Sequence, residues 1–243
     1  MPSTGPAVTI PALQQMKRDG KKIVGVVAWD YQIAQIAERA GVEIVSVGDS
    51  VGVNLWGQGA DEITLEEMLV VCKAVRRGVK RALLSCDLPS RFINTESAMR
   101  LVKEGGADMI KVEASAELVR AIAGAGIPVF AEFHGGRRKE VLVEEAKRLE
   151  EAGAALLDFR HSGPEAGRAV VKAVSIPVIG GLGGGPWLDG RMRMAHAAVG
   201  YAASCIDSKT EAYANVAQIT LDAISEYAGD VRASRQLKGQ RPA

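Results

Sequence analysis

The stretch Ile44–Gly57, IVSVGDSVGVNLWG, decides how the rest of the chain is interpreted. It opens with a mainly apolar run, which is typical of a strand buried on both faces of a parallel sheet. The run breaks at Gly48, and Asp49 and Ser50 follow at once. Because parallel α/β folds carry their functional groups where the strands end, the stretch predicts such a fold, with Asp49 and Ser50 at the rim that bears the site.

The same arrangement, a buried strand followed by an amphipathic helix, recurs along the chain. We expect strands at residues 23–28, 43–48, 81–87, 107–114, 127–133, 154–161, 176–181 and, as the eighth, 201–207. Helix caps separate them, such as the capping box that Thr64 forms with Glu67. Eight β-α units predict a (β/α)8 TIM-type barrel with its site at the C-terminal strand ends. A doubly wound open sheet is the alternative, and the absence of a GxGxxG loop after the first strand favours the barrel.

Residues 1–243 are expected to form one barrel domain. Residues 1–20 form a lead-in that contains a short helix, and a long amphipathic helix over about residues 211–228 closes the chain. The basic and polar tail, residues 230–243, is expected to be loose.

The charge balance excludes several classes of partner. With 30 basic and 29 acidic residues the formal net charge is +1, so we expect neither nucleic acid nor an anionic membrane as a partner. We find no apolar run of about 18 residues that would span a membrane, and the N-terminus lacks the apolar core of a signal peptide. The three cysteines are far apart and have no metal-finger spacing, which indicates a reduced, cytoplasmic protein.

Polar residues gather at or just after the predicted strand ends. They are Asp49, Ser50, Asp87, Lys111, Glu113, Glu132, His134, Asp158, Arg160 and His161. So many carboxylates on one rim would repel one another unless a cation neutralised some of them. Oxygen ligands favour Mg²⁺, with Mn²⁺ or Co²⁺ as substitutes. Such an ion can hold a 2-oxo acid through its carboxylate and keto oxygens and so stabilise an enolate.

Each of these residues also has a purely structural interpretation. A single acid at a strand end is more often a helix cap or an ion-pair partner, but Asp49, Asp87 and Glu113 on three adjacent strands favour a metal site. Lys111 alone could form a Schiff base. Glu113 lies two residues further on the same strand face, so a charged pair fits better than an apolar pocket that would lower the lysine pKa.

Several longer segments match a known family in order and spacing. They are KIVGVVAWDYQIAQIAERAGVEIVSVGDSVGVNLWG (22–57), ITLEEMLVVCKAVRRG (63–78), CDLP (86–89), GGADMIKVE (105–113) and IPVIGGLGGGPWLDGRMRMAHAAVG (176–200). With them the chain resembles the ketopantoate hydroxymethyltransferase (3-methyl-2-oxobutanoate hydroxymethyltransferase) family of the phosphoenolpyruvate mutase/isocitrate lyase superfamily. The resemblance implies a homo-oligomer in pantothenate biosynthesis. Its reaction adds the metal-bound enolate of 2-oxoisovalerate to a formaldehyde equivalent from methylene-tetrahydrofolate, which gives ketopantoate.

The resemblance also implies roles for individual residues. Asp49 and Asp87 would be direct ligands of Mg²⁺, and Glu113 would be a ligand or would hold a metal-bound water. Ser50 and Lys111 would bind the 2-oxo acid.

The middle of the chain departs from the family pattern. Glu132 stands where the family has a histidine, and Arg160 stands where it has the glutamate that takes the C3 proton. We therefore expect a relative with the same metal-held 2-oxo acid but an altered substrate, whose base is Asp158, His161, Glu132 or His134. Arg160 would bind a second anionic group of the substrate, since its planar fork suits a carboxylate or a phosphate.

Two other functions stay open. A lyase, hydrolase or mutase that acts on a C–C or P–C bond would fit the wider superfamily, although the cysteine-containing loop of many such enzymes is absent from the sequence. A non-catalytic barrel subunit is the other alternative, and the cost of keeping unneutralised carboxylates together argues against it. The glycine-rich GLGGG (181–185) is either a phosphate-binding loop or a tight turn.

Overall fold

The computed structural model describes residues 5–113, 115–208 and 211–239. The chain divides into two compact units, Met1–Arg193 and Met194–Ala243, which are taken one at a time below.

A closed barrel of parallel strands, ordered β1 to β8 around the ring, confirms the predicted (β/α)8 fold and excludes the open sheet. The strands are β1 (Ile23–Val27), β2 (Ile44–Val47), β3 (Leu83–Asp87), β4 (Met109–Glu113), β5 (Val129–His134), β6 (Ala154–Arg160), β7 (Val178–Gly180) and β8 (Gly190–Met194). Most of their residues are buried, because side chains fill the interior and helices cover the outside.

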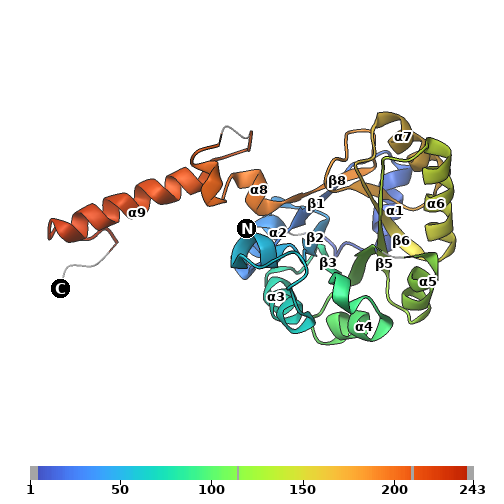
Figure 1. Ribbon diagram of the computed structural model, residues 1–243, viewed down its shortest axis with the longest axis horizontal. Coiled ribbons are helices and arrows are strands. Elements are labelled where there is room, and N and C mark those ends of the chain that lie inside the picture. The colour runs from blue at the N-terminus through green and yellow to red at the C-terminus, as the bar shows by residue number, and fades with distance from the viewer. Residues whose placement is uncertain (1–4, 114, 209–210, 240–243) are drawn as a thin grey trace. The chain divides into compact units, whose positions relative to one another are not determined.

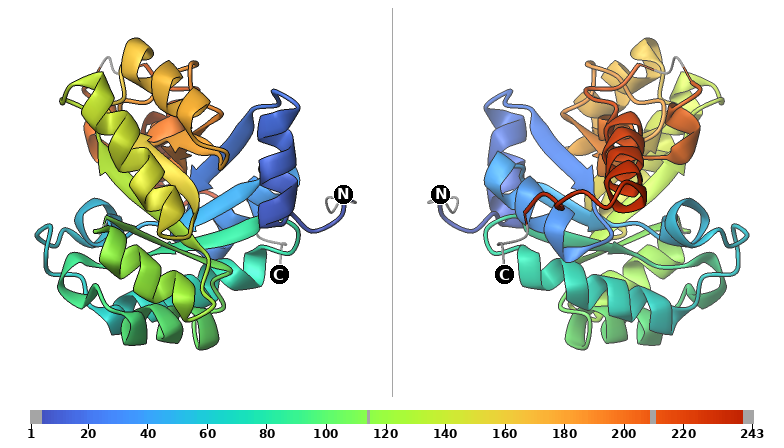
Figure 2. Two further views of the ribbon diagram at one scale, coloured as in Figure 1. Left: turned by 90° about the vertical axis from the view of Figure 1, so that its right-hand side faces the viewer. Right: turned by 90° about the vertical axis from the view of Figure 1, so that its left-hand side faces the viewer.

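Helix α1 precedes β1, and helices α2 to α7 each follow a strand and lie outside the ring (Figures 1 and 2). They are α1 (Ile10–Arg18), α2 (Tyr31–Ala40), α3 (Leu65–Gly78), α4 (Thr95–Lys103), α5 (Ala116–Gly124), α6 (Lys139–Glu151) and α7 (Pro164–Ala173). Two short helices, η1 (Gly52–Trp56, a π-helix) and η2 (Ser90–Phe92), follow β2 and β3. The predicted capping box holds at α3, where the Thr64 side chain accepts from the Glu67 amide and the Glu67 side chain accepts from the Thr64 amide.

One apolar layer fills the barrel and includes a residue from every strand. Its members are Leu13, Ile23, Ile44, Leu83, Met109, Phe130, Leu156, Ile179 and Met192. Leu13 belongs to α1, so the helix expected in the lead-in packs onto the core. The apolar interior leaves the C-terminal strand ends for polar side chains.

The strand register aligns those polar side chains across neighbouring strands. Asp87 of β3 pairs with Lys111 of β4, and Glu113 of β4 pairs with Glu132 of β5. On β5 and β6, Glu132 pairs with Asp158 and His134 with Arg160. The carboxyl ends of β3 to β6 therefore form one continuous charged rim.

The position predicted for the eighth strand is wrong. Residues 201–207 contain the 3₁₀-helix η3 (Ala203–Cys205), and the strand lies earlier, at Gly190–Met194. Met192 of this strand is buried while Arg191 and Arg193 are exposed, which is the alternation of a strand with one face on the core. A Cβ at Gly190 would lie 2.2 Å from the carbonyl oxygen of Ile23, so only glycine allows this close approach to β1.

The second unit contains α8 (Ala195–Val199), η3 and α9 (Val216–Arg232). The side chains of α9 that are apolar and largely exposed are Ile219, Leu221, Ile224, Tyr227 and Val231. The helix continues through Arg232, three residues into the segment expected to be loose, while residues 240–243 of that segment and residues 1–4 of the lead-in fall outside the described residues. None of the described helices is both long enough and apolar enough to cross a membrane.

Candidate active site

The loop after β2 carries Asp49 and Ser50 to the rim. Gly48 is required here, because a Cβ would lie 2.9 Å from Cγ1 of Val27. Both Asp49 and Ser50 are partly buried. Burial raises the pKa of the Asp49 carboxyl, and the positive charge of Lys111 opposes this shift. Asp49 therefore lies within the electrostatic reach of the residues on β3 to β6.

Lys111 is the centre of a buried charge cluster. Its Nζ contacts Glu132 Oε2 and lies 3.4 Å from Asp158 Oδ2 and 3.7 Å from Asp87 Oδ2. The side chains of Glu132 and Asp158 are only 6% and 3% exposed. Burial disfavours a charged lysine, but the carboxylates of Asp87, Asp158 and Glu132 raise the pKa of Lys111 above its ordinary value. Lys111 is therefore a fixed cation, which agrees with the charged pair expected from the sequence and not with a neutral Schiff-base amine.

One oxygen of Asp87 has no partner in this cluster. Oδ1 is buried and makes no hydrogen bond to any described residue. Burial, together with the negative charges of Asp49, Glu132 and Asp158, raises the pKa of Asp87 to about 7, although Lys111 opposes the shift. Burial also raises the pKa of Asp158, whose Oδ1 accepts a hydrogen bond of 2.9 Å from the amide of Gly181. The cluster therefore has more negative charge than its own cations neutralise.

The two departures from the family pattern contact each other. Arg160 Nη1 donates to Glu132 Oε1 at 2.5 Å. Burial works against an ionised Glu132, but Lys111 and Arg160 lower the pKa of this carboxyl. Glu132 and Arg160 therefore form one ion pair and neutralise each other in charge.

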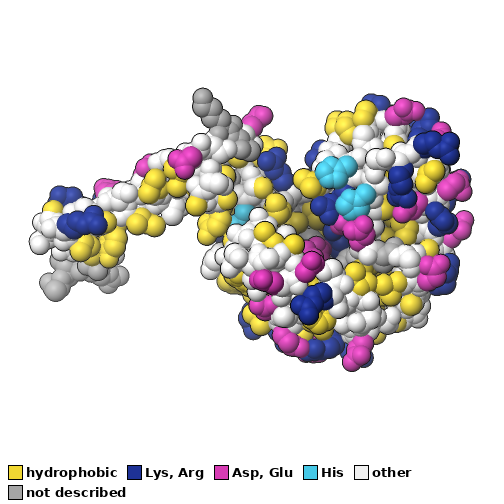
Figure 3. Space-filling view, in the orientation of Figure 1, with side chains coloured by type: hydrophobic (Ala, Val, Ile, Leu, Met, Phe, Trp, Pro, Cys, Tyr) yellow, Lys and Arg dark blue, Asp and Glu magenta, His cyan; other side chains and the backbone are white. Residues whose placement is uncertain are grey.

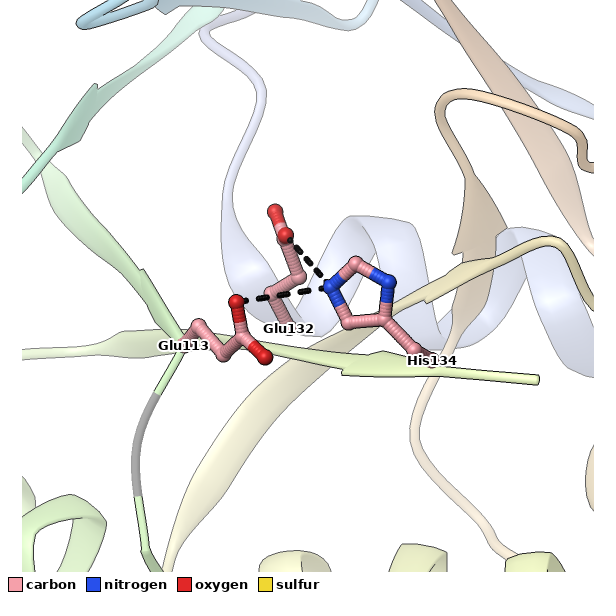
Figure 4. Close-up of side chains that lie close together, drawn as sticks. All are labelled: Glu113, Glu132 and His134. Atoms are coloured by element: carbon pink, nitrogen blue, oxygen red, sulfur yellow. Dashed lines mark ion pairs between the residues drawn. The ribbon is translucent and has the colours of Figure 1, made fainter. Parts of the chain in front are cut away.

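His134 joins Glu113 and Glu132 at the edge of the same rim (Figure 4). One potential ligand atom from each of these residues lies within 4.8 Å of the other two. Among the described residues no other trio of acidic, histidine or cysteine side chains is this close, so Asp49 and Asp87 belong to none. Histidine, acidic and basic side chains also gather on this face of the barrel in Figure 3.

His161 has an unusual backbone. Its φ is 49°, in the left-handed region that non-glycine residues rarely adopt. Its amide donates to the carbonyl of Leu182 at 2.9 Å, and a Cβ at Gly183 would lie 2.4 Å from its Nδ1. Close backbone packing around Gly183 thus accounts for part of the GLGGG segment as a tight turn. Trp187 is also held in place, since its Nε1 donates to Ser162 Oγ at 2.8 Å.

Sequence reasoning missed two buried hydroxyl groups below the charged rim. Ser46 and Ser85 are register partners on β2 and β3, and neither Oγ has a hydrogen-bond partner among the described residues. Ser85 lies two residues before Asp87, which places both on the same face of β3. The available signal was a serine inside each apolar strand run. Arg137 and Glu145, which line a cavity next to His134, were missed because they lie beyond the strand ends.

The fold and the site define the class of protein: a (β/α)8 barrel whose charged residues stand at the C-terminal strand ends, where barrels of this kind carry their active sites. Solved structures with this fold include a phosphonopyruvate hydrolase in complex with oxalate and Mg²⁺, at a TM-score of 0.64 and 17% identity over 96% of this chain and 91% of that one. A 2,3-dimethylmalate lyase, a member of the PEP mutase/isocitrate lyase superfamily, has a TM-score of 0.64 and 14% identity over 98% and 100%.

The family follows from sequence comparison. The family model of ketopantoate hydroxymethyltransferase matches residues 7–136 and 132–236. The 3-methyl-2-oxobutanoate hydroxymethyltransferase of Cyanothece sp. is 36% identical over 93% of this chain and 96% of the relative, and that of Moorella thermoacetica is 34% identical over 94% of each. The chain belongs to the ketopantoate hydroxymethyltransferase family and is a transferase of that type, as the sequence motifs predicted.

Proposed function

We propose that this chain is a divalent-metal-dependent enzyme that enolises a 2-oxo acid and adds a one-carbon unit at C3. The nearest reaction is hydroxymethyl transfer to 2-oxoisovalerate, with methylene-tetrahydrofolate or formaldehyde as the donor. The observation that carries the proposal is the buried cluster of Lys111 and three carboxylates at the rim, with one oxygen of Asp87 left without a partner.

The residues present fit a hard divalent cation. Lys111 supplies one positive charge within 3.7 Å of Asp87 and Asp158 and contacts Glu132, so that cluster alone is overall negative when it is ionised. Asp87 offers a buried, unpartnered oxygen of the kind that Mg²⁺ binds. Asp49 and Asp87 would be the direct ligands, with Glu113 as a further ligand or as the group that holds a water. Mg²⁺, or Mn²⁺ or Co²⁺ in its place, would supply the charge that polarises the 2-oxo acid.

Lys111 and Ser50 are the groups that would orient the substrate. The 3.7 Å separation between Lys111 Nζ and Asp87 is too long for a hydrogen bond, so the ammonium has a donor left for a substrate carboxylate. The surrounding carboxylates keep this ammonium charged, and the charge then favours binding of an anion.

Among the four candidates for the base, we assign proton transfer at C3 to His161. Glu132 is held by Lys111 and Arg160, Asp158 is held by Lys111 and the Gly181 amide, and His134 Nε2 lies within 3.4 Å of Glu113 and Glu132. His161 is exposed, follows Arg160 directly, and has a strained backbone of the kind that persists at functional sites.

Arg160 would select the substrate. Its side chain is 30% exposed, and Glu132 accepts from only one of its nitrogens. The remaining guanidinium donors suit a second carboxylate or a phosphate on the 2-oxo acid, which 2-oxoisovalerate lacks.

The test is a product assay with purified protein, Mg²⁺, 2-oxoisovalerate and either donor. Ketopantoate that forms in the wild type but not in Asp87→Asn supports the family reaction. If none forms, the same assay is repeated with 2-oxo acids that carry a second carboxylate or a phosphate. Turnover of these by the wild type and its loss in Arg160→Met would support an altered substrate, and failure with every 2-oxo acid would refute the proposal and favour a non-catalytic barrel.

A further inference from the structure

We propose that Glu113, Glu132 and His134 form a second metal site that binds a first-row transition ion such as Zn²⁺ or Co²⁺. This inference goes beyond the proposed function, because it concerns a different ion and two ligands, Glu132 and His134, that the proposed Mg²⁺ site does not use, while Glu113 is common to both sites. It depends on three side chains at the ends of β4 and β5, which Figure 4 shows pointing toward one another.

The backbone fixes this arrangement. Glu132 and His134 are two residues apart on β5 and so project from the same face of the strand. Glu113 is the register partner of Glu132 on β4. The three side chains therefore converge because of strand geometry, without help from a long loop.

The separations match those between ligands of one ion. Nε2 of His134 lies 3.2 Å from Glu132 Oε1 and 3.4 Å from Glu113 Oε2. Ligand atoms at about 2.0–2.1 Å from a tetrahedral ion are roughly 3.3 Å apart, so both pairs already have the spacing of one coordination shell.

The hydrogen bonding of His134 provides an independent observation. Nε2 is buried and makes no hydrogen bond to any described residue, although carboxylate oxygens lie on two sides of it. A buried polar atom without a hydrogen bond is costly, and an imidazole nitrogen flanked by two carboxylates is an arrangement that a shared metal ion would satisfy.

The composition of the trio selects the kind of ion. Mg²⁺ and Ca²⁺ prefer oxygen ligands only, while imidazole nitrogen favours zinc, iron, cobalt or nickel. Glu132 Oε1 also accepts from Arg160 Nη1, and a carboxylate oxygen has the lone pairs to accept this bond and still bind an ion.

An ion could enter from an adjoining cavity. A cavity of about 550 Å³ is lined by all three residues of the trio and by Ser115, Arg137 and Glu145. It leaves room for water or a small anion as a fourth ligand, which is the open position of a catalytic site and not the closed shell of a structural one.

The test is a titration of metal-free protein with Co²⁺, followed by visible absorption. The Asp87→Asn variant, which lacks a ligand of the proposed Mg²⁺ site, should still bind one Co²⁺ per chain. Adding His134→Ala to that background should weaken Co²⁺ binding by at least about tenfold. In the same background Glu113→Gln should weaken it similarly, while the chemically matched Glu145→Gln, which lines the same cavity but contributes no atom to the trio, should not.

Two results would overturn the inference: equal Co²⁺ affinity in the parent and in His134→Ala, or equal losses of Co²⁺ affinity in Glu113→Gln and Glu145→Gln. Either result would leave an ion pair between His134 and the two carboxylates as the explanation of the contacts. If Asp87→Asn does not fold, the imidazole NMR signals of the wild-type protein, assigned with His134→Ala, decide the question: those of His134 must shift on addition of Zn²⁺. The outcome is separate from the proposed function, since a protein without 2-oxo acid chemistry could still bind Co²⁺ at the trio.

Discussion

Replacing Lys111 by methionine should destabilise the protein strongly and in a pH-dependent way. Each Lys111 contact at 3.4–3.7 Å corresponds to roughly 4–5 kcal/mol of Coulomb energy at an effective dielectric constant of about 20. The cost of burying the lysine offsets part of this energy, so we expect the loss typical of a broken buried ion pair, about 3–5 kcal/mol at pH 8. Urea denaturation would measure it.

The sign of the pH dependence follows from the carboxyl groups left behind. Asp87 already has a folded-state pKa of about 7, raised from 3.8, so the folded state binds a proton that the unfolded state has released. Proton binding by Asp87 therefore stabilises the folded state fully below about pH 4, and this stabilisation is lost as the pH rises through 7. Without Lys111 the carboxyl pKa values rise further, and the loss in Lys111→Met should therefore be smaller at pH 5 than at pH 8.

A matched control lies elsewhere in the barrel. Lys17 forms a similarly buried ion pair with Asp189 at 3.0 Å and also donates to two backbone carbonyls. Lys17→Met removes one buried cation from one carboxylate, so its cost should vary much less between pH 5 and pH 8. The electrostatic account of the cluster would be refuted if Lys111→Met lowered the free energy of unfolding by less than about 1 kcal/mol, or by the same amount at pH 5 and pH 8.

Three further predictions concern the metal, a glycine and assembly. Mg²⁺ must displace the proton of Asp87, so below pH 7 the affinity for Mg²⁺ should increase by up to about tenfold for each unit that the pH increases. The Asp87→Asn variant should lack this pH dependence. Calorimetry in buffers of different ionisation enthalpy would measure both. Gly183→Ala should displace His161 and lower the free energy of unfolding, measured by urea denaturation, by roughly 1–3 kcal/mol. The new alanine Cβ would lie 2.4 Å from Nδ1 of His161, and residue 183 has a strained backbone φ of 70°. Gly136→Ala, at φ 87° with no atom within 4 Å, should show the strain alone, and equal costs for the two would contradict the contact. The exposed apolar side chains of α9 should make the protein a homo-oligomer in light scattering, and a wild-type monomer would contradict this expectation.

Patterns that depend on local sequence were predictable. The buried strands, the capping box at Thr64 and the acid at the end of β3 all follow from residues a few positions apart. The eighth strand was missed because its evidence is not local: Gly190 is needed only since the backbone of Ile23 lies beside it. GRMRM also has just three apolar or small positions alternating with arginines, which is a weak strand signal.

The site was predictable as a set of residues but not as a set of contacts. The sequence indicates that Glu113 stands at a strand end, but only the register brings it beside Glu132 and within 3.4 Å of His134. Similarly, Glu132 and Arg160 were two separate departures from a family pattern until the structure joined them in one ion pair. Side-chain pairing across strands depends on barrel shear, which a single sequence does not specify.

The most direct test of the central claim is hydrogen–deuterium exchange at C3 of 2-oxoisovalerate, and of 2-oxo acids that carry a second carboxylate or a phosphate, followed by proton NMR in D₂O. The account predicts exchange that requires the protein and a divalent cation and is lost in Asp87→Asn. Exchange that proceeds equally without divalent cation and in Asp87→Asn would contradict metal-dependent enolisation at this rim.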